Sequence, residues 1–286
     1  MSKEPFFSVI IPALNEEKYL PLLLQDLADQ STQDFEVIVI DGRSTDKTVE
    51  NTLKFKKKLP SLTILSSKIR NVSVQRNLGA QKSKGQYLLF NDADNRLPEY
   101  FLEGLRYQIH VKPVDLFTCW SLPDTDKSSD KTVSTFFNML IETGYLTNSP
   151  SAFGALIGCR RAIFPHTNGF DPQVGFAEDT DFVRRGYKKG YSFNVFREPR
   201  YVYSLRRFHK LGTIRILQKS ALLNLKYLTG QKVDQKKEYP MGGEHLEKDK
   251  TSLDFSKTLQ LILKKRSKTK ITDRLKALLS LEESHL

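Results

Sequence analysis

Apolar runs alternate with amphipathic stretches along the first half of the sequence. Near-continuous apolar runs of strand length occur at 6–13, 35–41, 62–67 and 87–91. The intervening segments are expected to be helical, at 16–30, 44–58 and 72–85. Strands that lack apolar–polar alternation are typical of a parallel sheet with helices on both faces. The pattern therefore predicts an α/β domain of strand–helix–strand units around a mostly parallel sheet.

The second half is less regular. A strand is expected at 115–123 and a helix at 128–146, and small residues at 152–164 permit close backbone approach. A Gly- and Pro-rich loop, a helix opened by acidic residues and a further strand are expected within 168–195. In the first half, Ser44 or Asp46 is expected to cap the helix that follows it, and Gly85 to end the helix before it.

Three polar segments follow three of the predicted strands. They read PALNEE after the first strand, DGRSTD after the second and NDADN after the fourth. Because the carboxyl ends of parallel strands meet at one edge of a sheet, ligands of such sheets bind there. The three segments are therefore expected to line one crevice.

Asp92 and Asp94 are separated by one residue directly after an apolar strand. If the chain turns there, both carboxylates face the crevice and suit Mg²⁺ or Mn²⁺, with phosphate oxygens completing the shell. An exposed turn is the alternative. Asp41 ends the second strand, where a carboxylate can accept a hydrogen bond from a nucleoside or can shape a turn.

Other charged residues flank the same edge. Arg76 is expected to clamp phosphate or to fix Asp92 through a bidentate pair, the alternative being an ordinary surface arginine. Glu178 and Asp179 open a helix, where acidic residues complement the helix dipole. The catalytic interpretation is that of a general base, which takes a proton from an acceptor hydroxyl.

Four motifs occur in an order that resembles the family 2 glycosyltransferases of the GT-A fold. They are VIIPALNEEKYL, VIVIDGRSTDKT, the segment from QRNLGAQ through NDADN, and GFDPQVGFAEDTDFVRRGYKKGY. The resemblance covers residues 6 to about 205, and the set is specific although no single motif is. It implies a Rossmann-like, mostly parallel sheet, a nucleoside-diphosphate sugar donor and transfer with inversion.

The resemblance also implies roles for individual residues. The nucleoside pocket is lined by Pro12, Ala13, Asn15 and Glu16, and Asp41 contacts the base. Asp92-Ala93-Asp94 is the DXD motif, with Asp94 the more direct metal ligand. Asp179 matches the aspartate that serves as base in inverting members.

Two departures from the family pattern refine this expectation. The second strand ends in Asp41-Gly42, with one acidic residue where many members have two. The Q-x-x-R-W motif of processive members is replaced by SLRRF, which keeps Arg207 but has Ser204 in place of Gln. We therefore expect transfer of a single sugar, with Arg207 able to reach the diphosphate.

The positive charge is concentrated in the last part of the chain. Residues 206–286 hold 19 Lys and Arg against 9 Asp and Glu, within a total net charge of +12. Apolar residues recur at helical spacing in 211–229 and 255–281, with a polar linker at about 230–252. The domains are predicted as a catalytic domain at 1–209 and a basic amphipathic extension at 210–286.

Such an extension has two alternative interpretations: docking on the catalytic domain, or contact with an anionic membrane surface. The second interpretation predicts a cytoplasmic enzyme, peripheral on the inner membrane face, with a glycan or polyprenyl-phosphate-type acceptor. No signal peptide or membrane-spanning run is expected, and two cysteines set no disulfide framework.

Four other classes stay open as alternatives. A glycosyltransferase with a soluble acceptor needs no membrane contact. A sugar nucleotidyltransferase would require a Gly-rich loop where this chain reads PALNEE. A nucleic-acid-binding module would interleave aromatic with basic residues, so no nucleic-acid partner is predicted. A non-catalytic scaffold relative is the last.

Overall fold

The computed structural model describes residues 4–152 and 155–228. Contacts within this part divide it into two compact units. The first comprises 4–152, 155–173 and 178–205, and the second comprises 174–177 and 206–228. The first unit contains all of the sheet, and the predicted basic segment at 255–281 lies outside the described residues.

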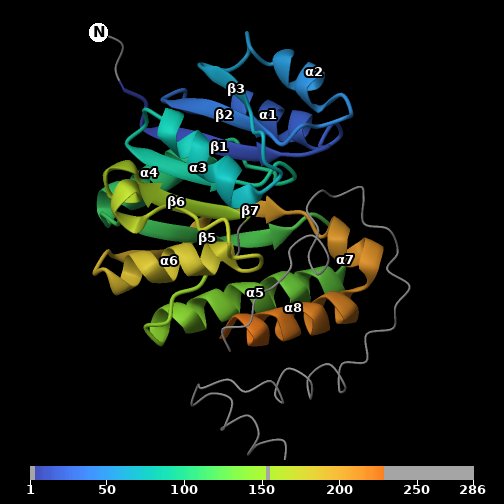
Figure 1. Cartoon of the computed structure of the whole chain (residues 1–286), viewed down its shortest axis with the longest axis vertical. Coiled ribbons are helices and arrows are strands. Elements are labelled where there is room, and N and C mark those ends of the chain that lie inside the picture. The colour runs from blue at the N-terminus through green and yellow to red at the C-terminus, as the bar shows by residue number, and fades with distance from the viewer. Residues whose placement is uncertain (1–3, 153–154, 229–286) are drawn as a thin grey trace, which may run out of the picture. The chain divides into compact units, whose positions relative to one another are not determined.

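The first unit is built on a seven-stranded sheet with the order β3-β2-β1-β4-β6-β5-β7 (Figure 1). Six strands run in one direction, and β6 runs antiparallel to both of its neighbours. The strands are β1 (Phe7–Ala13), β2 (Phe35–Asp41), β3 (Leu62–Ser66), β4 (Tyr87–Asn91), β5 (Leu116–Pro123), β6 (Leu156–Arg160) and β7 (Phe193–Tyr203).

Helices cover both faces of this sheet. Apolar residues of α1 and α4 pack on one face, while α3, α5, α6 and the 3₁₀ helix η1 contribute to the core on the other (Figure 1). Adjacent residues of β1 alternate between the two cores, with Val9 on one face and Ile10 on the other. The helices are α1 (Leu20–Ala28), α2 (Thr48–Leu53), α3 (Val72–Lys82), α4 (Phe101–Val111), α5 (Ser128–Leu146), η1 (Arg161–Thr167) and α6 (Glu178–Lys188).

The mostly parallel α/β architecture is as predicted, but two local predictions are wrong. Helix α2 begins at Thr48, and Ser44 instead accepts a hydrogen bond from the Asn15 backbone N at 2.9 Å. Asp46 accepts from the Thr48 backbone N at 3.0 Å, but the capping position belongs to Lys47, which makes no side-chain cap bond. Helix α3 ends at Lys82, three residues before Gly85, because the Ser83 hydroxyl bonds the Ala80 carbonyl.

The second unit contains α7 (Arg206–Leu211) and α8 (Thr213–Leu228). Gly212 separates them with a φ of 89°, a left-handed conformation that glycine adopts without strain. Its backbone N donates to the Phe208 carbonyl, which ends α7. Helix α8 agrees with the helix predicted at 211–229. Between residues 4 and 228, leaving out 153–154, no helix has both the length and the apolarity to cross a bilayer.

Candidate functional site

The loops that follow β1 and β2 are joined to each other by hydrogen bonds. Asn15 adopts a left-handed φ of 55°, and its side-chain oxygen accepts from the Thr45 backbone N at 2.8 Å. The Glu16 backbone N donates to the Thr48 hydroxyl at 2.7 Å. The Ala13 carbonyl, which follows Pro12, accepts from the Gly42 backbone N at 2.8 Å. The first two predicted segments therefore form one rigid wall.

Asp41 lies at the base of this wall and is buried. Its carboxylate accepts hydrogen bonds from the backbone N of Arg43 at 3.1 Å and of Ser44 at 3.1 Å. These two hydrogen bonds are those expected if Asp41 shapes a turn, which was one of its two predicted roles. It shapes the loop in which Arg43 has a left-handed φ of 65°.

Arg76 is the residue that joins the third predicted segment to the fourth. Its side chain is 2% exposed; Nη2 contacts Asp92 Oδ1 at 3.1 Å and Nη1 contacts Glu178 Oε1 at 3.1 Å. The guanidinium also lies over the Phe170 ring, 5.2 Å from its centroid. The surface-arginine alternative is wrong. Arg76 does contact Asp92, through Nη2, while Nη1 serves Glu178.

The turn containing Asp92, Ala93 and Asp94 directly follows β4. The Ala155 carbonyl accepts from the Asp92 backbone N at 3.0 Å and from the Asn95 side chain at 2.6 Å. Ala93 is buried, while Asp92 and Asp94 are half-buried. The turn that carries both carboxylates is therefore held in place by hydrogen bonds to the Ala155 carbonyl.

Asn95 is a site residue that the sequence reasoning missed. It is fully buried, and its side chain also donates to Asn91 Oδ1 at 2.9 Å. Asn is a common turn residue, so its position after the two acids is the one signal that pointed to it.

Helix α6 begins with the predicted acidic residues. The Glu178 side chain is 15% exposed and turns towards Arg76, and Asp179 Oδ1 accepts from the Thr180 backbone N at 2.6 Å. Asp181 instead pairs with Arg185 at 2.7 Å, and Arg185 holds the Gly169 carbonyl at 2.6 Å. Asp181 therefore supports the approach to the helix, whereas Glu178 is joined through Arg76 to the acidic turn after β4.

The electrostatics of the site centre on Arg76. Burial acts to lower the pKa of its guanidinium, but the charges of Asp92, Glu178 and Asp179 outweigh burial and raise that pKa. Burial acts in the opposite direction on the Tyr201 phenol, whose pKa it raises, with a smaller contribution from the charges of Cys119 and Asp92. Tyr201 lies on β7 and belongs to the hydrophobic core beneath the site.

The carboxylates fit a hard divalent cation that shares its shell with a ligand. Within the residues that the structure describes, no group of three or more His, Cys, Asp or Glu side chains could hold an ion by protein ligands alone. Mg²⁺ usually takes one or two carboxylates together with phosphate oxygens and waters. Asp94, with Asp92 beside it, can supply such a set.

Arg207 is the predicted site residue that lies outside the first unit. It belongs to α7 in the second unit, whereas Asp41, Arg76, Asp92 and Glu178 all belong to the first.

Comparison with known proteins gives one family for this chain. The model described as "Glycosyl transferase family 2" matches residues 8–167, which is more than half of the chain. A curated relative, the poly(ribitol-phosphate) beta-N-acetylglucosaminyltransferase TarS of Staphylococcus aureus, is 27% identical over 209 residues. The match covers 70% of this chain and 36% of TarS, so the chain spans about a third of that relative.

Solved structures give the same fold. S. aureus TarS 1–349 in complex with UDP-GlcNAc matches with a TM-score of 0.57 and 19% identity, covering 81% of this chain and 69% of that one. The mannosyltransferase PcManGT of Pyrobaculum calidifontis, in complex with GDP-Man and Mn²⁺, matches with a TM-score of 0.63 and 21% identity. That match covers 81% of this chain and 66% of PcManGT. The similarity establishes a GT-A-like arrangement of sheet and helices.

Proposed function

The chain belongs to glycosyl transferase family 2, and on this premise we propose that it moves one sugar from a nucleoside-diphosphate sugar to an acceptor. The observation that carries the proposal is the buried Arg76, which ties Asp92 after β4 to Glu178 at the start of α6. A buried cation shared by two acidic segments is costly to desolvate, which makes it a candidate functional centre. UDP-GlcNAc and GDP-Man, which are bound in two of the similar structures, support this donor class.

The donor binds at the carboxyl edge of the parallel strands. In our proposal the loops containing Pro12, Ala13, Asn15 and Glu16 form the nucleoside pocket, and the Asp41 loop closes it against the base. Their mutual hydrogen bonds support this role, because a pre-formed wall needs no further ordering when the nucleotide binds. Arg207 is kept as a candidate for contacting the diphosphate.

Asp94 and Asp92 would hold Mg²⁺ or Mn²⁺ against the diphosphate. A bound divalent cation supplies charge stabilisation to the phosphate oxygens as the leaving group develops its negative charge. Arg76 acts on these carboxylates as a positioning residue, because it is enclosed and contacts Asp92 directly.

Asp179 is proposed as the general base. The acceptor oxygen forms a bond to the anomeric carbon while the bond from that carbon to the diphosphate oxygen breaks. The acceptor proton passes to the Asp179 carboxylate, and the nucleoside diphosphate leaves with the bonding electron pair. Attack opposite to the leaving group inverts the anomeric configuration. An anionic phosphate acceptor carries no such proton, so Asp179 is then not required as a base.

Glu178 precedes the proposed base in sequence, and we do not assign it the role of base. Its ion pair with Arg76 orients the start of α6, so we assign it a positioning role within the catalytic pair.

We further propose a lipid-linked acceptor, such as a polyprenyl phosphate, reached from the cytoplasmic face of the membrane. The basic composition of residues 206–286 supports this placement. Flotation with anionic vesicles tests it. Salt-sensitive binding by the full chain, lost on truncation after residue 210, is expected; equal behaviour of both forms would favour a soluble acceptor.

The transfer itself is tested by release of UDP or GDP from a panel of sugar donors with Mn²⁺. One donor class is expected to be cleaved faster on adding acceptor, and chelation is expected to stop it. Protection against thermal unfolding by the same donor reports binding independently of turnover. A chain that binds and cleaves none of the donors would contradict the proposal.

A further inference from the structure

A cavity of about 830 Å³ lies on the α3 and η1 face of the first unit, apart from the acidic turn. Arg160 pairs in register with Tyr87, the first residue of β4, whereas Asp92 follows the last residue of that strand. The cavity's arginine end is therefore at the amino edge of the sheet. Asn77, next to Arg76 in sequence, lines the opposite end. The volume of the cavity falls within the range of pockets that hold small ligands.

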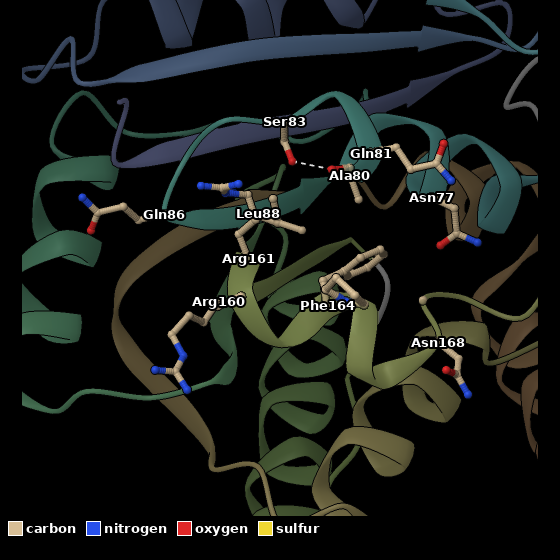
Figure 2. Close-up of a pocket in the computed structure, with 13 residues that line it drawn as sticks. Asn77, Ala80, Gln81, Ser83, Gln86, Leu88, Arg160, Arg161, Phe164 and Asn168 are labelled. Atoms are coloured by element: carbon tan, nitrogen blue, oxygen red, sulfur yellow. Dashed lines mark hydrogen bonds between the residues drawn. The ribbon is translucent and has the colours of Figure 1, made fainter. Parts of the chain in front are cut away.

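Figure 2 shows how the lining side chains are arranged. Gln86, Arg160 and Arg161 lie at one end, and Asn77 and Asn168 lie at the other, with Phe164 between them. Further apolar lining comes from Ala80, Leu88 and Pro165. The cavity thus has a cationic end, an apolar middle and an end lined by carboxamides.

The cationic end is accessible. Arg160 is 49% exposed and contacts Asp115 at 2.5 Å. Arg161 is 41% exposed, contacts Glu4 at 3.5 Å and donates to the Gly85 carbonyl at 2.7 Å. These contacts hold both guanidinium groups in place while leaving other N–H groups to face solvent. All 13 lining residues are described, and none of them is acidic. Asp115 and Glu4 each occupy one side of these guanidinium groups, and the N–H groups left over can bind an anionic group at this end.

The other end offers neutral hydrogen-bonding groups. Asn77 is already used, because it bonds the Phe170 backbone at 2.7 and 2.8 Å. Gln81 and Asn168 are exposed, and their carboxamides make no side-chain hydrogen bond to any residue that the structure describes. A carboxamide both donates and accepts, which matches a hydroxyl group on a sugar ring. The apolar middle suits the C–H face of such a ring.

We propose that this cavity is a second, non-catalytic site for a phosphorylated saccharide. The phosphate lies between Arg160 and Arg161, the sugar ring lies against Phe164, and its hydroxyl groups bond Gln81 and Asn168. The site goes beyond the proposed transfer, since it uses none of the residues assigned to donor binding or catalysis. Its occupant is held and no bond in it is broken.

Isothermal titration of the full chain with lactose 1-phosphate tests the proposal, with lactose and inorganic phosphate as separate probes. Excess UDP and GDP are included in a parallel set to keep the donor site filled. We expect saturable binding of lactose 1-phosphate in both sets, tighter than either probe alone, and weakened by salt because the phosphate contacts are exposed.

Two variants locate the binding. Gln81→Ala with Asn168→Gly removes both carboxamides, and glycine accepts the Asn168 φ of 62°; an affinity loss of about tenfold is expected. Arg160→Gln should cost about 10–100-fold, because it removes a hydrogen bond to a charged group. Arg106→Gln is the matched control, since Arg106 also pairs with one carboxylate, Asp34.

The outcomes separate cleanly. Loss of binding in both cavity variants, with Arg106→Gln unchanged and with circular dichroism showing folded proteins, supports the site. Competition by UDP or GDP would assign the ligand to the donor site and overturn the proposal. If inorganic phosphate alone binds as tightly as lactose 1-phosphate, the site does not recognise a saccharide, which overturns that part of the proposal. Absence of saturable binding at millimolar lactose 1-phosphate would overturn the whole proposal. None of these results depends on whether sugar transfer is observed.

Discussion

Both edges of the sheet hold acidic side chains in place, but the partners of these side chains differ. At the amino edge, Glu36 Oε1 accepts from the Ser8 hydroxyl at 2.7 Å and from the Lys84 backbone N at 2.5 Å. At the carboxyl edge, Asp92 and Glu178 share the charged guanidinium of Arg76. One carboxylate is held by neutral donors, and the other two are held by a cation.

This difference distinguishes an arrangement that only joins strands from one that can take part in chemistry. Neutral donors are sufficient to bury one carboxylate and leave no charge to share with a ligand. A shared cation fixes two acidic segments at once, and the charge balance of the pair changes when a diphosphate or a metal ion arrives. The carboxyl edge should therefore be the more costly one to disturb.

Removing the shared cation should have the largest effect. Arg76→Met leaves Asp92 and Glu178 without their buried partner, and we expect a loss of about 3–5 kcal/mol in the free energy of unfolding. Urea denaturation measures it. Arg106→Met removes a half-exposed partner of Asp34 and should cost at most about 1 kcal/mol. Similar losses in the two variants would remove the distinction between the sites.

Neighbouring acids of α6 should separate activity from stability. Asp179→Asn is expected to lower kcat by about 10²–10⁴-fold with a hydroxyl acceptor, because the base is lost. Glu178→Gln should cost about 1–3 kcal/mol of stability, since it weakens the ion pair with the buried Arg76. Turnover and denaturation are measured on both. Full activity in Asp179→Asn would leave the base unassigned, unless the acceptor is an anionic phosphate.

Glycines at the two edges provide a test of packing. A Cβ on Gly85, at the amino edge, would lie 2.6 Å from the Ser8 backbone N, whereas one on Gly42 would meet the flexible Gln75 side chain at 3.0 Å. We expect Gly85→Ala to cost about 1–3 kcal/mol and Gly42→Ala less. Thermal unfolding compares them. A reversed order would mean that the carboxyl-edge loops are packed as tightly as the strand starts.

The smallest effect concerns an exposed loop at the carboxyl edge. Burial acts to raise the pKa of Asp46, but hydrogen bonds from Thr48 and Glu17 outweigh it and lower that pKa below 3.8. Because the pKa of Asp46 is lower in the folded state, its ionised carboxylate stabilises the protein above about pH 3.8. This stabilisation is lost as the pH falls through the folded-state pKa. The Tm difference between wild type and Asp46→Asn should therefore shrink in acid. A difference that is constant with pH would contradict this.

Much of the parallel half of the sheet could be predicted from apolar runs. The strand at 35–41 and the helix at 128–146 have the bounds expected of them. The antiparallel direction of β6 was not predicted, because an apolar run has the same pattern in either direction. Its small residues have a packing reason: a Cβ on Gly158 would lie 1.9 Å from the Phe117 ring.

Some candidate site residues were predicted because polar residues directly follow strands. Asp41, Asp92 and Asp94 were predicted that way, since the ends of parallel strands share an edge. The burial of Arg76 depends on Phe170 and Glu178, about a hundred residues later in the chain, so local spacing could not reveal it. Tyr201 lies on β7, more distant still in the chain, so local spacing could not relate it to this region either.

The central claim is that Asp94 and Asp92 grip a divalent ion against the diphosphate of the donor. The most direct measurement is the affinity for UDP and GDP, with and without Mn²⁺, in wild type and in Asp94→Ala. The account predicts that Mn²⁺ tightens nucleotide binding in wild type by at least about tenfold, or 1.4 kcal/mol, and leaves Asp94→Ala unchanged. Equal tightening by Mn²⁺ in both proteins would contradict it.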